Sequence, residues 1–226
     1  MNFLSHFYFD RYTSDPDRVL GMVLPDLVKN ARKEWCFRPE KHPEKFSGSK
    51  AMESLLTGWK RHLLVDKHFH SSAFFCHHTQ LIKASISEVL VNSPARPSFV
   101  AHIALELMLD ALLLTDSVID AEDFYDRIAA ADRQELKRFF ELNNVSEVQP
   151  FFNFLDEFIE SSYLNSYRDA QNIMYALSRI CMRLWAEPFN ETQKLQLTAS
   201  LVDYQFSLKN EYISIFYEID SVLNGD

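Results

Sequence analysis

Two stretches of the chain decide the fold and the candidate chemistry: RHLLVDKHFH, residues 61–70, and AHIALELMLD, residues 101–110. In each stretch, a histidine or a carboxylate recurs at every fourth residue among apolar residues. Steps of four keep side chains near one face of an α-helix, with about 40° of rotation per step. We therefore predict two helices that each carry three metal-type side chains on one face: His62, Asp66 and His70 on the first, and His102, Glu106 and Asp110 on the second.

These polar side chains lie beside apolar surface, where unsatisfied histidines and carboxylates cost roughly 1–3 kcal/mol each, and charges cost more. A bound cation would remove that cost. The alternative is ordinary, because a single histidine–carboxylate pair at i, i+4 is usually a surface hydrogen bond. The two runs occur together and contain no lysine or arginine at the six positions. We therefore favour a metal centre between two helices.

The rest of the chain predicts an all-α protein, a single-domain multi-helix bundle of the HD-like type. Only 4 glycines and 8 prolines interrupt the 226 residues, and no alternating strand pattern of useful length occurs. We expect one helical domain over residues 1–226, with the metal site in about 1–118 and further helices in about 119–226. Residues 34–50 have loop composition, and Pro25 would kink or break the helix it lies in. Helix starts are expected after Asp15, Ser71 or Ser72, Ser98, Asp120, Ser146 and Asn190.

The sequence also favours a cytoplasmic protein. The N-terminal residues lack the basic start of a signal peptide. We expect no apolar run of the roughly 18–20 residues that cross a membrane. The three cysteines form no CxxC pair, which is typical of reduced thiols.

Charge is unevenly distributed along the chain. The net charge of −9 disfavours nucleic acid as a partner. Residues 29–61 nevertheless contain nine lysines and arginines against four glutamates. This basic segment is either a solvated, mobile connection or a docking surface for an acidic partner. The oligomeric state is left open.

Mixed histidine and carboxylate ligands suit Mn, Fe, Zn or Mg better than a metal that prefers thiolates. Such a cation lowers the pKa of bound water and neutralises charge on a phosphoryl oxygen. Phosphoester hydrolysis is therefore the reaction we expect. A di-iron centre is the alternative for a helical bundle, but the Glu-x-x-His spacing typical of those centres does not occur in this chain.

Four segments resemble the acyl carrier protein phosphodiesterase family. The opening MNFLSH resembles that family's MNFLAH start, and LGMVLPDLVKN, residues 20–30, resembles its segment with a fixed glycine and aspartate. GWKRHLLVDKHFH, residues 58–70, resembles its histidine–aspartate segment, and the helix around Asp110 resembles a further aspartate element. The resemblance covers about the first half of the chain.

The resemblance implies an all-helical, metal-dependent enzyme, typically with manganese, that acts in lipid metabolism. The family hydrolyses the phosphodiester joining 4′-phosphopantetheine to holo-acyl carrier protein. It carries over His6, Asp26, His62, Asp66 and Asp110 to the site, with Asp26, His62 and Asp66 in catalytic roles. The full candidate ligand set is His6, Asp26, His62, Asp66, His70, His102, Glu106 and Asp110.

The chain departs from the family's pattern at three places. His70 stands where the family has an aspartate, Leu63 where it has an arginine, and Ala111 where it has a histidine. His70 and His102 could replace missing ligands, but the loss of the arginine removes a phosphate contact. The alternatives are hydrolysis of another small phosphoester, and a non-catalytic helical binding protein that kept the fold.

Overall fold

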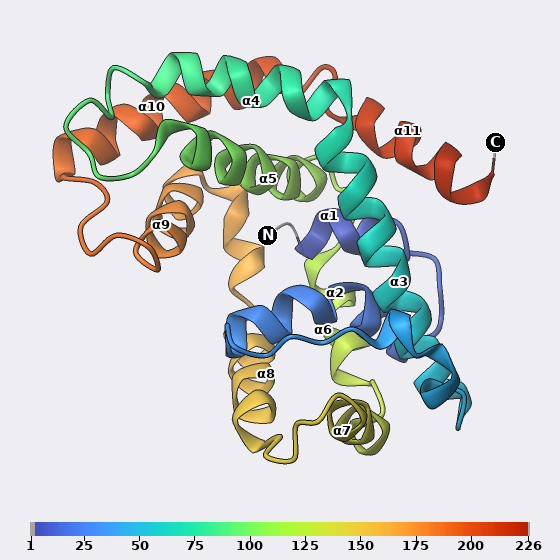
Figure 1. Ribbon diagram of the computed structural model, residues 1–226. Helices are drawn as coiled ribbons and strands as arrows, with labels where there is room; N and C mark the ends of the chain where they lie inside the picture. Colours follow the sequence, from blue (N-terminus) through green and yellow to red (C-terminus); the bar gives the residue numbers. More distant parts are fainter. Residues whose placement is uncertain (1–2, 226) are drawn as a thin grey trace. The chain divides into compact units, whose positions relative to one another are not determined.

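The computed structural model describes residues 3–225, and these residues form an all-α bundle without a strand (Figure 1). The fold class predicted from the sequence is therefore confirmed. The α-helices are α1 (Phe3–Tyr8), α2 (Pro16–Ala31), α3 (Lys50–Ser71), α4 (Ala73–Ile86), α5 (Pro97–Thr115), α6 (Ala121–Ala129), α7 (Arg133–Leu142), α8 (Gln149–Ser161), α9 (Ala170–Cys181), α10 (Glu191–Leu208) and α11 (Ile213–Asn224). Three short 3-10 helices are η1 (Pro39–Lys41), η2 (Pro43–Phe46) and η3 (Tyr163–Arg168).

Side-chain capping explains most of the predicted helix starts. Asp15, Ser72 and Asp120 each accept a hydrogen bond from a backbone N–H in the first turn of the helix that follows. Asn190 forms a reciprocal capping box with Gln193. Each cap satisfies a backbone donor that has no partner within the helix.

Two predictions about helix ends were wrong. α5 begins at Pro97, because proline takes the first helical position, and Ser98 lies inside the helix. α8 begins at Gln149 after Val148, so Ser146 is not its cap. α2 continues through Pro25 to Ala31 without a break.

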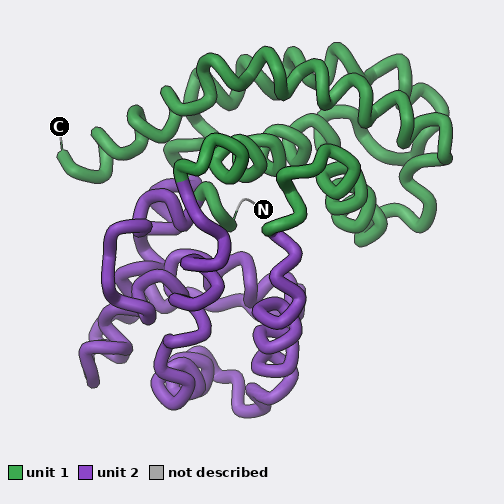
Figure 2. The backbone as a smooth tube through the Cα atoms, turned by 180° about the vertical axis from the view of Figure 1, so that it is seen from behind, with its two compact units in different colours: residues 1–5, 67–118, 165–226 green, residues 6–66, 119–164 purple. Residues whose placement is uncertain are grey.

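The chain forms two compact units, shown in green and purple in Figure 2. The described residues of unit 1 come from 1–5, 67–118 and 165–226, and those of unit 2 from 6–66 and 119–164. α1 and α3 each supply residues to both units. These units do not coincide with the expected halves, about 1–118 and 119–226, because segments distant in sequence pack together.

Unit 1 is built around α5, which packs against α4, α9 and α10. Every residue from Ile103 to Leu114 is buried. α5 is also long and apolar enough to cross a membrane, contrary to our expectation that no segment has these properties. In this structure 78% of its most apolar stretch is buried inside the protein.

Unit 2 packs α2 against α6 and α8. Its 34–50 connection is held by aromatic side chains. Phe37 lies 4.9 Å from Phe140, and Phe46 lies 4.9 Å from Phe139, measured between ring centroids. Both phenylalanines of the connection are buried. The basic segment is therefore anchored to the core of unit 2 by its own apolar residues.

Candidate metal sites

The described residues contain two groups of three side chains that could hold a metal ion. The first, in unit 2, is His6, Asp66 and His62, and the second, in unit 1, is His70, His102 and Glu106. Within each group, one ligand atom per residue lies within 4.8 Å of the others. Ligands on opposite sides of an ion lie about 4.2 Å apart. Both groups therefore approach the dimensions of a metal site.

A close crossing of α2 and α3 positions His62. Gly58 lies one turn before His62, and a Cβ at residue 58 would lie 2.2 Å from the carbonyl oxygen of Arg18. On the facing helix, a Cβ at Gly21 would lie 2.3 Å from the carbonyl oxygen of Leu55. Only glycine permits helix backbones to approach this closely. The crossing brings the next turn of α3 against the backbone of α2.

The orientation of the His62 ring follows from this crossing. Its Nδ1 lies 2.8 Å from the carbonyl oxygen of Met22, a geometry in which Nδ1–H donates to that oxygen. The ring then carries its lone pair on Nε2. Histidines that bind metals usually donate their second ring N–H to a carbonyl or a carboxylate in this way.

His6 completes the first group from α1. Its ring stacks on that of His62, with centroids 4.0 Å apart and an angle of 21° between the planes. Both histidines are buried, and Asp66 is half-buried on the turn of α3 after His62. The stacking fixes two imidazoles side by side next to one carboxylate.

A buried ionic cluster holds the end of α1 close to α2 and α3. The Asp10 carboxylate pairs with Arg18 at 2.7 Å and with Arg61 at 3.3 Å, and Arg61 also donates to the carbonyl oxygen of Phe9. Burial raises the pKa of Asp10, although both guanidinium groups oppose the change. The residue before His62 is thus tied to the segment that follows His6.

The second group is more tightly clustered. His70 Nε2 lies 3.1 Å from His102 Nε2 and 3.2 Å from Glu106 Oε1, and His102 Nε2 lies 3.0 Å from the same oxygen. The Phe75 ring of α4 contacts both imidazoles, at centroid distances of 4.8 Å and 4.9 Å. These contacts bring together side chains from α3 and α5.

Glu106 is ionised in this cluster. Burial works against the charged form most strongly, but hydrogen bonds from His102 and His70 favour it, and the pKa of Glu106 lies well below its usual range. The group therefore offers a carboxylate, not a carboxylic acid.

Two residues predicted for the site belong to neither group. Asp110 accepts hydrogen bonds from the backbone N–H groups of Leu4 and Ser5 and from the Ser5 hydroxyl, at 3.2, 2.7 and 2.6 Å. Burial raises its pKa to about 7, against the effect of these donors. Asp110 thus fastens the start of α1 within unit 1. Asp26 lies half-buried on α2, one turn after Met22.

Sequence reasoning missed the supporting residues. Gly58, the Met22 carbonyl oxygen and Phe75 carry no metal-type side chain, so no ligand pattern identifies them. The sequence distinguishes Gly58 only as part of the GWKRH motif. Its spacing of four from His62 indicates a close helix contact that orients the histidine.

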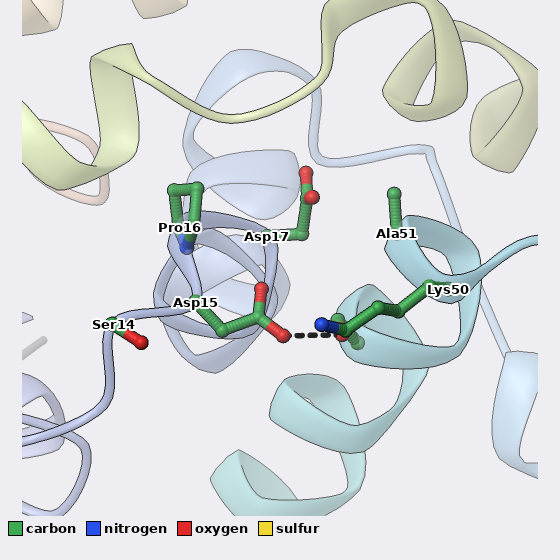
Figure 3. A pocket seen from close by; sticks show the side chains of 7 residues that line it. Ser14, Asp15, Pro16, Asp17, Lys50 and Ala51 are labelled. Carbon is green, nitrogen blue, oxygen red and sulfur yellow. Dashed lines mark hydrogen bonds between the residues drawn. The ribbon is translucent and has the colours of Figure 1, made fainter.

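A cavity of about 330 Å³ lies in unit 2, and Figure 3 shows the side chains that line it. Ser14, Asp15, Pro16 and Asp17 line it from the start of α2, and Lys50, Ala51 and Ser54 line it from α3. The Asp15 carboxylate accepts a hydrogen bond of 2.6 Å from Ser54 within it. None of the eight candidate ligands lines this cavity.

No protein-family model, curated protein or solved structure matches the chain. What remains to indicate a function is the geometry of the two groups and the resemblance of the four motif segments.

Proposed function

We propose that this chain is a cytoplasmic, metal-dependent phosphodiesterase whose cation is held by His6, His62 and Asp66. The observation that carries the proposal is the hydrogen bond between His62 Nδ1 and the Met22 carbonyl oxygen, which leaves Nε2 for a ligand role. The clustering of three ligand atoms supports it. The same three residues lie on the segments that resemble the acyl carrier protein phosphodiesterase family.

The donor set fits a divalent transition-metal ion. Two imidazoles and one carboxylate suit Mn, Fe or Zn, and the resemblance favours manganese. A bound ion of this class would lower the pKa of a coordinated water and offset the negative charge of the phosphodiester. Three protein ligands leave positions for both water and substrate.

The protein residues supply orientation and charge. The Met22 carbonyl oxygen and the stacked His6 ring fix the plane of His62, so its lone pair has one direction. Asp66 supplies the negative charge of the donor set. The family resemblance implies a catalytic role for Asp26, which is half-buried on α2.

The basic segment 29–61 is the proposed docking surface for acyl carrier protein, which is acidic. It belongs to unit 2, as do all three ligands. Eight of its nine cations are exposed: Lys29, Arg32, Lys33, Arg38, Lys41, Lys45, Lys50 and Lys60. The buried side chains of Phe37 and Phe46 hold the segment in place, so these charges form a fixed surface. Such a surface speeds association with a partner of opposite charge.

The test compares two substrates, holo-acyl carrier protein and bis(4-nitrophenyl) phosphate. Reversing Lys29, Arg32 and Lys33 to glutamate should slow release of 4′-phosphopantetheine several-fold at low salt. The difference should shrink as salt rises, because surface charges are screened over about 8–10 Å. Turnover of the small diester should be unchanged.

The matched control reverses three exposed cations of unit 1, Lys83, Arg179 and Arg183, with the same change in net charge. It should leave both activities unchanged. An equal loss in both triple variants would show that net charge alone matters, and would contradict the docking surface.

A second candidate is hydrolysis of a different small phosphoester. It is favoured by Leu63, an apolar residue where the resembling family has an arginine next to the motif histidine. Turnover of the small diester without any release of 4′-phosphopantetheine would support this candidate.

A further inference from the structure

We propose that His70, His102 and Glu106 form a second metal site, which binds a divalent transition-metal ion independently of the His6 group. This inference goes beyond the proposed phosphodiesterase, because it assigns a separate ion to unit 1. It follows from the distances among three ligand atoms and from the protons that these atoms can carry.

The three atoms form a nearly equilateral triangle with edges of 3.0, 3.1 and 3.2 Å. An ion about 2.1 Å from each atom would subtend ligand–metal–ligand angles of about 90–100°. These angles are close to those of one face of an octahedron. The arrangement is that of two histidines and one carboxylate on a single side of an ion, with the other positions open.

The three contacts of the triangle cannot all be favourable hydrogen bonds at the same time. Each Nε2 carries either a proton or a lone pair, and an ionised carboxylate only accepts. If both Nε2 atoms are protonated, two N–H groups face each other across 3.1 Å. If one is not, its lone pair faces Glu106 Oε1. One of the three contacts is therefore repulsive in every state in which Glu106 is ionised, whereas a central cation would attract the lone pairs of all three atoms.

The surroundings hold this geometry in place. Glu106 projects from the buried helix α5, and its side chain is 4% exposed. Phe75 contacts both imidazoles, and Phe69 contacts His70 at a centroid distance of 5.2 Å. A site built on rigid helices and packed by aromatic rings requires little rearrangement to bind an ion.

The site remains open on its histidine side. The side chains of His70 and His102 are 28% and 37% exposed. The open positions of a bound ion would thus be accessible to water or a small anion. Two imidazoles disfavour Mg²⁺ and Ca²⁺, which prefer oxygen ligands, and favour Co²⁺, Ni²⁺ and Zn²⁺.

The experiment titrates the metal-free full chain with Co²⁺, and measures bound ions by equilibrium dialysis and coordination by visible absorption. The wild-type chain should bind two ions, and His102→Ala and His62→Gln should each bind one. Glu106→Gln keeps the size of the side chain, and should weaken the unit 1 ion by about tenfold or more. His77→Ala removes an exposed histidine of α4 outside both groups, and should retain two ions.

Far-UV circular dichroism of each metal-free variant confirms that it is folded before it is compared. One ion in both the wild-type chain and His102→Ala would overturn the second site. One ion that both His102→Ala and His62→Gln remove would overturn its independence. Neither result would contradict diester hydrolysis at the His6 group, because that activity is measured separately by comparing the wild-type chain with His62→Gln.

Discussion

Replacing Gly58 with alanine tests how helix packing builds the His62 site. A Cβ at residue 58 would lie 2.2 Å from the Arg18 carbonyl oxygen and 2.6 Å from the Met22 amide nitrogen. Carbon and oxygen normally approach no closer than about 3.3 Å. Both contacts are with the backbone of α2, which cannot rotate away. α3 must therefore move by about 1 Å at this turn.

The change in the free energy of unfolding of Gly58→Ala follows from two opposing effects. In an exposed helix interior, glycine to alanine stabilises by about 1 kcal/mol. Overpacking of a tight contact costs about 1–3 kcal/mol and sometimes more, and a backbone clash belongs at the upper end. We expect a net loss of about 2 kcal/mol in the free energy of unfolding. The same displacement would lengthen the 2.8 Å hydrogen bond that orients His62, and should weaken metal binding at least about tenfold.

Urea unfolding of the metal-free chain measures the loss of stability, and calorimetric titration with Mn²⁺ measures the loss of metal affinity. Gly48→Ala is the control, because its Cβ would meet the Arg138 guanidinium at 3.1 Å, and that group can move aside. It should change stability by less than about 0.5 kcal/mol. A Gly58→Ala chain as stable as the wild type, with unchanged Mn²⁺ affinity, would refute the role of the crossing.

Three further changes have definite expected results. Asp66→Ala should abolish metal binding at the first group with little loss of stability, because it removes one acid from a metal-free cluster; unfolding with unchanged metal content would make Asp66 structural. Burial lowers the pKa of His78 from 6.5, despite the attraction of Glu211, so the unfolded state binds more protons and stability should fall as pH drops below about 6.5. Urea unfolding at pH 7 and pH 5 should show a smaller fall in His78→Gln, and equal falls would contradict this. Asp10→Ala should cost about 2–4 kcal/mol in thermal or urea unfolding, since it leaves Arg18 and Arg61 without their shared carboxylate; a cost below 1 kcal/mol would show that the cluster contributes little.

The sequence was most informative where local chemistry decides the structure. Asp15, Ser72, Asp120 and Asn190 were identified as helix caps because a short polar side chain satisfies a free backbone N–H directly. It was least informative where distant segments meet. The two units combine segments separated along the chain, and no periodic pattern encodes that pairing.

The grouping of the candidate ligands was likewise not predictable from the sequence alone. Steps of four rotate by about 40° each, so the third residue of a run lies about 80° from the first. The first run accordingly divides: His62 and Asp66 group with His6, whereas His70 groups with His102 and Glu106. Asp110, the last residue of the second run, binds backbone N–H groups of α1 instead. The residue types were predictable, but their grouping required the fold.

The basic segment illustrates a further limit of composition. Two prolines and a glycine within residues 34–50 favoured a loop, and a mobile one was an open interpretation. Phe37 and Phe46 nevertheless pack on α7. Their spacing follows no helix or strand period, so their burial depends on aromatic partners about 100 residues away along the chain.

A catalytic cation at His6, His62 and Asp66 is tested most directly by the rate at which the full chain hydrolyses bis(4-nitrophenyl) phosphate before and after Mn²⁺ is added. We expect no turnover in the metal-free chain, turnover after Mn²⁺ is added, and loss of that turnover in His62→Gln and Asp66→Asn. His77→Ala should retain wild-type turnover. Equal Mn²⁺-dependent rates in the wild type and His62→Gln, or no turnover in the Mn²⁺-loaded wild type, would contradict a catalytic cation at His6, His62 and Asp66.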